Sequence, residues 1–339
     1  MVPQQPAVHL EQVRQQLGPG HQLAKPGLAV VEPLAQQIAD HFFGQQSVDG
    51  LGTVRQNGLK LHFYQRFIAG VVRFGIGAFP PVEDIRQEVA QLGQAGYKEV
   101  VLTGINLPAY GKELGLHLCD AVEAACEAPG IQRVRLGSLE PEQLTPEVIA
   151  RMASQDKLCP QFHLSLQSGC DATLRRMNRH YTTAEYGQIV GNLREAFPGC
   201  AITTDVMVGF AGETEEEFEA SLSFVRKIGF SKVHVFAYSR RPGTRAYDMP
   251  GQVTAREKED RSHRMIEATR ATQQAFLQAQ LGQAEEVLFE QQKEQGLWEG
   301  YTRNYTHVLA PSGRDLSGQL VQVRLESVQG ESCVGKIEK

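Results

Sequence analysis

The apolar positions in the middle of the chain alternate between two periods. Val82, Ile85, Val89 and Leu92 recur at helical spacing, and a strand-like apolar run at residues 98–106 comes next. Four further strand-like runs follow at intervals of about 30 to 40 residues, the length of one β-α unit: 132–141, 161–169, 200–210 and 231–239. Because these runs are apolar throughout and helices fit between them, the pattern predicts a parallel sheet covered by helices.

Capping residues mark where three of these helices are expected to begin. Thr145 comes directly before a proline, which is typical of a first helical turn. Thr182 with Glu185, and Thr214 with Glu217, have the spacing of capping boxes. The starts of these helices are therefore predicted by local chemistry alone.

An open doubly wound sheet and a barrel both satisfy this alternation. The chain contains neither G-x-G-x-x-G after its first clear strand nor G-x-x-x-x-G-K-[ST], so the common nucleotide-binding fingerprints are missing. Polar residues instead follow strand after strand, as in barrel enzymes, whose sites lie at the carboxyl ends of the strands. Five strands are evident, which favours a partial barrel over a closed eight-stranded one.

The flanking regions have different patterns. Residues 1–78 hold twelve glutamines, show no sustained period, and are interpreted as a poorly ordered or irregular segment, although residues 59–72 are compatible with one or two strands. Residues 79–282 are assigned to the barrel, which ends in a long polar helix at 254–281. Short strand-like runs with turns fill residues 283–339 and predict a small β-barrel, a module type that often binds RNA.

Composition and charge narrow the function classes. The 339 residues carry a net charge of −5, so any attraction to nucleic acid has to be local. No apolar run approaches the roughly 20 residues of a membrane span, and the first residues lack the pattern of a secretion signal. These features predict a cytoplasmic protein. The six cysteines have no zinc-site spacing and the histidines are scattered, so no residue is predicted to bind a metal.

Three polar features at or near strand ends are candidates for ligand binding. Asp205 lies within an apolar run, where a carboxylate needs a partner, either a ligand or a structural hydrogen bond. Glu140 follows a strand and is suited to an amine or a ribose hydroxyl, or else is a solvated loop acid. Gly209 and Gly212 precede a capped helix and allow close backbone approach to a ligand, although many β-α turns contain such glycines.

Basic and aromatic residues are candidates for RNA contacts. One arginine cluster follows the strand at 161–169 and another follows the strand at 231–239; either is suited to phosphates or forms a solvated face. Trp298, Tyr301 and Tyr305 offer stacking surfaces beside Arg303 and Asn304, or else they are core aromatics. The last 57 residues hold nine acidic and six basic residues, so this module has no net basic charge.

Six stretches together resemble a known family. They are VVLTGINLPAYG, RLGSLEP, FHLSLQSGCDATLRRMNRHYT, DVMVGFAGETEEEFEASL, HVFAYSRRPGTRAYDMPGQV and GYTRNYTHV. In this order and spacing they resemble the radical-SAM methylthiotransferases, over about residues 80–339. The fifth and sixth are most similar to the branch that acts on N6-threonylcarbamoyladenosine at position 37 of tRNA.

The resemblance implies a fold and an activity. The fold is a partial (β/α)6 TIM-like barrel followed by an OB-like TRAM domain that holds tRNA. The activity is transfer of a methylthio group to C2 of the modified adenosine in the anticodon loop, with S-adenosylmethionine and [4Fe-4S] clusters as cofactors.

The resemblance also implies site residues, although it assigns no catalytic residue. The residues expected at S-adenosylmethionine are Gly104, Asn106, Ser138, Glu140, Gln167, Ser168, Asp205 and Gly209. Those expected toward tRNA are Arg175, Arg176, Arg179, Arg240, Arg241, Tyr301, Arg303, Asn304 and Tyr305.

The chain departs from the family at the cluster. The family's C-x3-C-x2-C is expected shortly before PPVEDIRQEV, yet residues 1–118 contain no cysteine, and the family's N-terminal cluster domain is not matched. Either residues 1–78 are the product of a mis-framed coding sequence, or the chain is a pseudoenzyme that binds tRNA without catalysis. In both cases we expect no radical chemistry. A third alternative is a cluster-free barrel enzyme that acts on a phosphorylated small molecule.

Overall fold

The computed structural model describes residues 51–56, 59–64, 69–74, 80–104, 107, 110–111, 115–294 and 296–338. The first two strands, β1 (Leu51–Gln56) and β2 (Leu59–Tyr64), form an antiparallel pair. Asn106 and the first fifty residues lie outside the described part of the chain, as do the sequence-based expectations that concern them.

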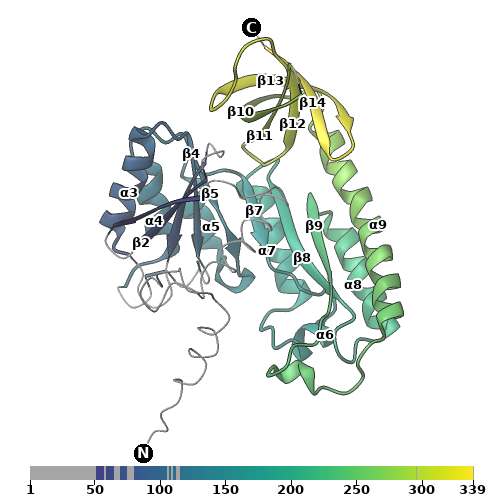
Figure 1. Ribbon diagram of the computed structural model, residues 1–339. Coiled ribbons are helices and arrows are strands. Elements are labelled where there is room, and N and C mark those ends of the chain that lie inside the picture. The colour runs from purple at the N-terminus through teal and green to yellow at the C-terminus, as the bar shows by residue number, and fades with distance from the viewer. Residues whose placement is uncertain are drawn as a thin grey trace, which may run out of the picture. The chain divides into compact units, whose positions relative to one another are not determined.

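Parallel strands form the centre of the described fold (Figure 1). They are β3 (Ala69–Phe74), β4 (Glu99–Gly104), β5 (Arg133–Leu136), β6 (Ser138–Leu139), β7 (Gln161–Leu164), β8 (Ala201–Val208) and β9 (Lys232–Ala237). β5 pairs with β4, and β6, which follows β5 after one residue, pairs with β7. The strands therefore form two parallel sheets, β3-β4-β5 and β6-β7-β8-β9, linked by an isolated parallel bridge between Val134 and Leu158. This arrangement confirms the predicted mixed α/β fold of TIM-like type.

The strand β3 lies ahead of residue 79, where the sequence pattern begins to predict the barrel. All six of its residues pair in parallel with β4, from Ala69 opposite Glu99 to Phe74 opposite Gly104. The stretch LKLHFYQRFIAGVV is compatible with one or two strands but has no sustained period, so the pairing with β4 rather than local pattern fixes the bounds of β3.

Helices connect the parallel strands and cover their outer face. They are α3 (Val82–Gln94), α4 (Leu118–Glu127), α5 (Pro146–Ala153), α6 (Asp171–Arg176), α7 (Thr183–Ala196) and α8 (Glu215–Ile228). The predicted caps are confirmed, since the side chains of Thr145, Thr182 and Thr214 each accept a backbone N–H of the first turn. None of the described helices is long and apolar enough to cross a membrane.

Alternate residues of the strands separate an outer, apolar face from an inner, polar one. On β8, Ile202, Val206 and Val208 are buried in the core shared with the helices. Thr203, Asp205 and Met207 occupy the alternate positions, are only partly buried, and face the inside of the barrel. The prediction of uniformly apolar strands thus describes the outer face, whereas the inner face carries the polar chemistry.

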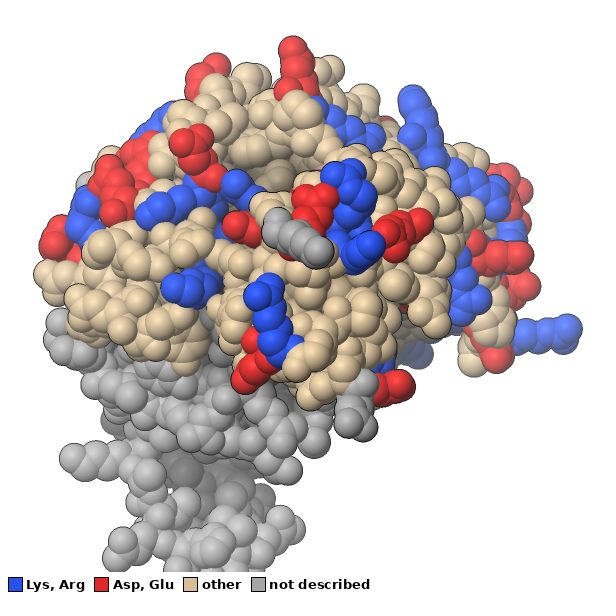
Figure 2. Space-filling model, turned by 90° about the horizontal axis from the view of Figure 1, so that it is seen from above, with Lys and Arg blue, Asp and Glu red and all other residues tan. Residues whose placement is uncertain are grey.

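The C-terminal part of the chain is a helix followed by a closed five-stranded barrel. The helix α9 (Ala255–Ala279) begins at Thr254 with a capping box. The strands are β10 (Ala284–Glu294), β11 (Leu297–Thr302), β12 (His307–Pro311), β13 (Leu320–Gln329) and β14 (Ser332–Ile337), in the order β10-β11-β12-β14-β13. The predicted small β-barrel is therefore confirmed. Acidic and basic side chains are interspersed over the face seen in Figure 2.

Glu88 is a buried carboxyl group on α3 and leads to a test of this core. Its two oxygens have no hydrogen-bond partner. Burial, and to a smaller extent the neighbouring Asp84, raises its pKa from 4.5 to about 7. The folded state therefore holds this proton more tightly than the unfolded state does. The stability from this group is fully present below pH 4.5 and is lost as the pH rises through 7.

We expect the Glu88→Gln variant to lack this pH dependence. Relative to the variant, the free energy of unfolding of the original chain should fall by up to about 3 kcal/mol between pH 5 and pH 8. Urea denaturation at both pH values measures the difference. Glu83→Gln, which changes an exposed acid on the same helix, is the control and should behave like the original chain. Parallel pH profiles for the original chain and Glu88→Gln would contradict the assignment.

Candidate functional site

A pocket of about 410 Å³ lies at the carboxyl ends of β7 and β8. Its lining residues are Gln167, Arg175, Arg176, Met177, Asn178, Arg179, Met207, Phe210, Arg245, Ala246 and Met249. We call it the arginine pocket. Its volume is in the range of small-molecule sites, and its position agrees with the place where barrel enzymes carry their active sites.

Unusual backbone conformations form part of this pocket. Among the described residues, only Gln167, Asn178 and Tyr305 combine a side chain with a positive φ, and the first two line the pocket. The backbone N–H of Gln167 donates to the carbonyl of Asp205 at 2.8 Å, and its carbonyl accepts the N–H of Met207 at 2.8 Å. The strand edge of β8 thus holds Gln167 in a strained conformation, a feature that is frequent at functional sites.

The four arginines of the pocket differ in how far the protein neutralises them. Arg176 forms a two-pronged ion pair with Glu217, which raises the pKa of the guanidinium. Arg179 pairs with Glu140 at 3.2 Å. Arg175 and Arg245 have no carboxylate partner among the described residues, so they retain uncompensated positive charge.

The remaining lining residues set the kind of ligand that fits. Met177, Met207, Phe210 and Met249 supply a polarisable, apolar surface beside the arginines. Sequence reasoning missed these four residues, because nothing in their local pattern separates them from core residues. A ligand with a flat apolar part and one or two anionic groups matches this lining, and a nucleotide of RNA has that chemistry.

The residues expected at S-adenosylmethionine are brought together only in part. Gln167 lines the pocket, and Glu140 reaches it through Arg179. Ser138 lies on β6, with its hydroxyl 3.2 Å from that of Ser165. Gly104 ends β4 and Asp205 lies inside β8.

Ser168 has a structural role in this arrangement. It is fully buried, and its hydroxyl accepts the N–H of Cys170 at 3.2 Å. This bond stabilises the turn between β7 and α6, so the side chain is engaged within the protein.

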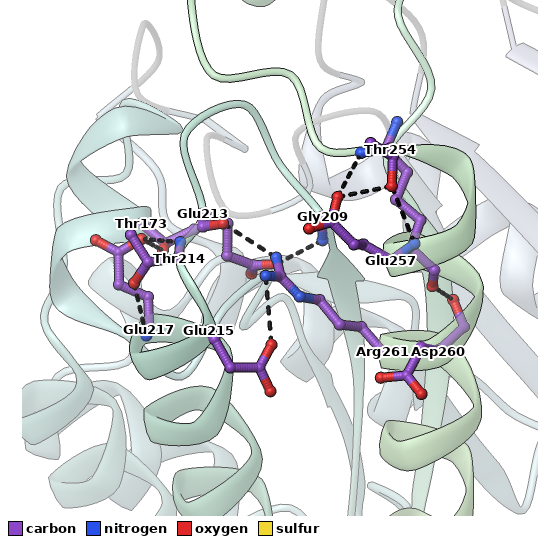
Figure 3. Close-up of polar contacts among 12 residues, drawn as sticks. Thr173, Gly209, Glu213, Thr214, Glu215, Glu217, Thr254, Glu257, Asp260 and Arg261 are labelled. Atoms are coloured by element: carbon purple, nitrogen blue, oxygen red, sulfur yellow. Dashed lines mark hydrogen bonds and ion pairs between the residues drawn. The ribbon is translucent and has the colours of Figure 1, made fainter.

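Gly209 and the turn after it are anchored by a buried ion pair (Figure 3). The N–H of Gly209 donates to the Glu213 carboxylate at 2.6 Å, and Arg261 of α9 donates to the same carboxylate at 2.9 Å. A Cβ at Gly209 would meet the side chain of Lys258 at 2.4 Å. The N–H that was expected to approach the cofactor is therefore used by Glu213, and the turn is held against α9.

The second arginine cluster is outside the pocket except for Arg245. Arg240 donates to the carbonyl of Tyr247 at 3.1 Å and lies over its ring, so it holds its own loop in place. Arg241 is exposed and does not line the pocket. Both remain accessible to a large ligand such as RNA.

The four C-terminal residues expected to contact RNA lie against the parallel sheet instead. Arg303 donates to the carbonyl of Leu158 at 3.0 Å, and Asn304 donates to that of Gly199 at 3.1 Å. Tyr301 and Tyr305 stack with their centroids 4.5 Å apart. Arg303 and Asn304 thus dock the small barrel at the amino ends of β7 and β8, while the side chains of Tyr301, Arg303 and Tyr305 stay partly exposed.

Arg135 contacts the stacked tyrosines and the turn that carries them. Its guanidinium lies 4.6 Å from the Tyr305 ring centroid, donates to the carbonyl of Arg303 at 3.1 Å, and pairs with Glu99 at 2.8 Å. This buried network joins β4 and β5 to the turn between β11 and β12. Sequence reasoning missed it because a strand arginine has no distinctive local pattern.

The cysteines do not fit an iron-sulfur cluster. Cys119, Cys126, Cys159, Cys200 and Cys333 are buried, and burial raises the pKa of each thiol, to about 12 for Cys126 and about 11 for Cys200. Cluster ligands are thiolates, which such surroundings disfavour. The sixth, Cys170, stands alone on the turn before α6. No set of three cysteines in C-x3-C-x2-C spacing exists in the chain.

Three polar residues that lie far apart in the sequence come close together inside the barrel. They are His163 of β7, Asp205 of β8 and His234 of β9, and one ligand atom of each lies within 4.8 Å of the others. The expectation that no histidine binds a metal rested on spacing along the chain. The signal that points to this group is the occurrence of polar residues at inward positions of three successive strands.

Comparison with known proteins identifies the family. Residues 63–225 match the Radical SAM superfamily. The chain is 35% identical to the threonylcarbamoyladenosine tRNA methylthiotransferase MtaB of Thermotoga maritima, covering 75% of this chain and 58% of that protein. It is 37% identical to the tRNA-2-methylthio-N(6)-dimethylallyladenosine synthase of Symbiobacterium thermophilum, covering 72% of this chain and 54% of that protein.

These matches cover only part of each relative. The chain spans between half and two thirds of the length of these relatives. A crystal structure of methylornithine synthase aligns with a TM-score of 0.42 at 15% identity, covering 74% of this chain and 71% of that one. With a Radical SAM match over residues 63–225 and 35 to 37% identity over about three quarters of its length, the chain is related to the radical SAM methylthiotransferases.

Proposed function

We propose that this chain binds the anticodon loop of tRNA through the arginine pocket. The observation that carries the proposal is the pair Arg175 and Arg245, which have no carboxylate partner among the described residues and lie beside an apolar lining in one pocket. Guanidinium groups form strong, two-pronged bonds with phosphate, and the methionines and Phe210 offer a surface for a base. The proposed base is N6-threonylcarbamoyladenosine, because the chain is 35% identical to the threonylcarbamoyladenosine tRNA methylthiotransferase of Thermotoga maritima. Its proposed place, position 37, follows from the family resemblance.

S-adenosylmethionine is proposed to bind next to this RNA site. When bound, it supplies the group-transfer chemistry of the family. The described residues that would hold it are Gly104, Ser138, Glu140 and Gln167, which lie at or just after the carboxyl ends of the parallel strands. Asn106, expected at the same ligand, lies outside the described residues. Gln167 lines the pocket, so the amide is placed to orient a polar ligand. The small β-barrel is proposed to be a TRAM domain.

We further propose that the chain, as given, binds its ligands without methylthio transfer. The six thiols do not meet the needs of a cluster, and no step through a cluster is assigned to this chain. Binding without catalysis is therefore the function that these residues support best.

The test is the affinity for an anticodon stem-loop that carries threonylcarbamoyladenosine. We expect the double variant Arg175→Ala/Arg245→Ala to bind roughly 10- to 100-fold more weakly, since each lost charged contact removes on the order of 1 kcal/mol or more. The plot of log affinity against log salt should lose a slope of about two. Fluorescence anisotropy at several salt concentrations measures both quantities.

The control is the double variant Arg226→Ala/Lys227→Ala, which removes two exposed charges from α8 away from the pocket. It should keep the affinity and the salt slope within about twofold. Equal losses in both double variants would contradict a specific role for the pocket. Failure of the original chain to bind RNA at low salt, together with binding of a phosphorylated small molecule, would favour the small-molecule alternative.

A further inference from the structure

His163, Asp205 and His234 lie on the inner faces of three neighbouring parallel strands. Asp205 of β8 is directly opposite His234 of β9 in the strand register. His163 of β7 is opposite Thr203, the inward-facing residue that precedes Asp205 on β8. One ligand atom from each of the three residues lies within 4.8 Å of the other two. The register of the sheet therefore places two imidazoles and one carboxylate around one point.

The distance between His163 and Asp205 agrees with the dimensions of a metal site. Nε2 of His163 lies 3.5 Å from Oδ2 of Asp205, which is long for a hydrogen bond. Metal–nitrogen and metal–oxygen bonds of about 2.0 to 2.2 Å in tetrahedral geometry put neighbouring ligand atoms about 3.4 Å apart. The nitrogen and the oxygen thus lie at the distance that two ligands of one ion adopt.

A hydrogen bond fixes the orientation of the first imidazole. Nδ1 of His163 lies 3.0 Å from the hydroxyl oxygen of Thr203, which leaves Nε2 on the side of Asp205. Histidine ligands of metals almost always use their second ring nitrogen in this way, and the bond fixes both the tautomer and the ring. His163 is only 2% exposed, so its ring is also held by packing.

The position of the group connects it to the arginine pocket. Met207, which lines the pocket, is two residues beyond Asp205 on the same face of β8, a distance of about 7 Å. Three protein ligands leave at least one coordination position for water or another ligand, as in catalytic rather than structural sites.

We propose that His163, Asp205 and His234 bind a divalent first-row transition-metal ion beneath the arginine pocket. Two imidazoles and a carboxylate suit Zn²⁺ or Fe²⁺, whereas Mg²⁺ and Ca²⁺ prefer oxygen ligands alone. The carboxylate supplies one negative charge beside two imidazole nitrogens, a ligand set that favours a cation over a water molecule. The proposal rests on the geometry of these three residues and not on RNA binding or an iron-sulfur cluster.

The test uses the full chain, stripped with a chelator and titrated with Co²⁺ as a spectroscopic probe and then with Zn²⁺ as a competitor. We expect one equivalent of Co²⁺ with the visible absorption of a four- or five-coordinate ion, displaced by one equivalent of Zn²⁺. Asp205→Asn and His234→Gln should each abolish stoichiometric binding. Thr203→Val, which removes the bond to His163, should weaken binding roughly 10- to 100-fold.

The matched control is His263→Gln, which changes an exposed histidine of α9 and should bind like the original chain. Circular dichroism and the melting temperature of each variant verify folding, and Thr203→Val decides the matter should a ligand variant fail to fold. The proposal is overturned if the original chain takes up no Co²⁺ or Zn²⁺. It is equally overturned if folded Asp205→Asn, His234→Gln and Thr203→Val variants bind as well as the original chain, or if the Co²⁺ spectrum shows thiolate charge-transfer bands.

Discussion

Anaerobic reconstitution of this chain with ferrous iron and sulfide is expected to incorporate no stoichiometric [4Fe-4S] cluster. The reconstituted chain is also expected to release no 5′-deoxyadenosine from S-adenosylmethionine. The physical reason is the state of the thiols: residues 1–118 contain no cysteine, and five of the six that follow are buried with raised pKa values. A cluster needs exposed or readily ionised thiolates in a common loop.

Acid-labile sulfide is the measurement to use, because the His163–Asp205–His234 group is itself expected to take up Fe²⁺. The methylthiotransferase of Thermotoga maritima, reconstituted in parallel, is the control for the procedure. Four sulfides per chain together with deoxyadenosine would refute the expectation. A C-x3-C-x2-C in another reading frame of the DNA ahead of Pro80 would explain the missing cysteines as a mis-framed coding sequence.

Replacing Arg261 by alanine is expected to lower the free energy of unfolding by about 3 to 5 kcal/mol. The ion pair between Arg261 and Glu213 is buried, with side-chain exposures of 6% and 1%. Removing the guanidinium leaves the carboxylate of Glu213 in a low-dielectric environment with only the Gly209 N–H to stabilise it. Urea denaturation of the original chain and the variant measures the loss.

The pH dependence of this loss has a defined sign. Burial already raises the pKa of Glu213 above its usual value, although Gly209 and Arg261 oppose the shift. Without Arg261 the pKa should rise further, so protonation of Glu213 restores part of the stability as the pH falls. The destabilisation should therefore be larger at pH 8 than at pH 5.

Arg264→Ala is the matched control, because Arg264 lies one turn further along α9 but is 33% exposed. Its removal should cost about 1 kcal/mol or less. The double variant Glu213→Gln/Arg261→Met should recover much of the stability that Arg261→Ala loses, since no buried charge remains. Similar losses in Arg261→Ala and Arg264→Ala would show that the buried pair contributes no more than a surface pair.

Local pattern predicted the elements whose signals are local. The strands β4, β7, β8 and β9 and the caps at Thr182 and Thr214 all appear where the sequence places them. β3 was indicated only roughly, because residues 59–72 are compatible with one or two strands but show no sustained period, and the pairing with β4 fixes its bounds. The division of each strand into an apolar outer face and a polar inner face also required the structure.

The candidate site was predictable to a smaller extent. Arg175, Arg176, Arg179 and Gln167 do line one pocket, as their position after a barrel strand suggested. The RNA contacts expected of Tyr301, Arg303, Asn304 and Tyr305 stay a prediction. The structure adds that Arg303 and Asn304 also dock the small barrel onto the sheet, which local pattern does not indicate.

The amino-acid sequence alone was enough to indicate the alternation of β and α units and the resemblance to one family. It also fixed the lack of cluster cysteines, which no folding can supply. The tertiary structure alone decided which distant residues meet. His163, Asp205 and His234 lie on separate strands, and their proximity depends on the parallel register that pairs Asp205 with His234. Pairing between strands is a non-local interaction, so the pattern within each strand cannot specify it.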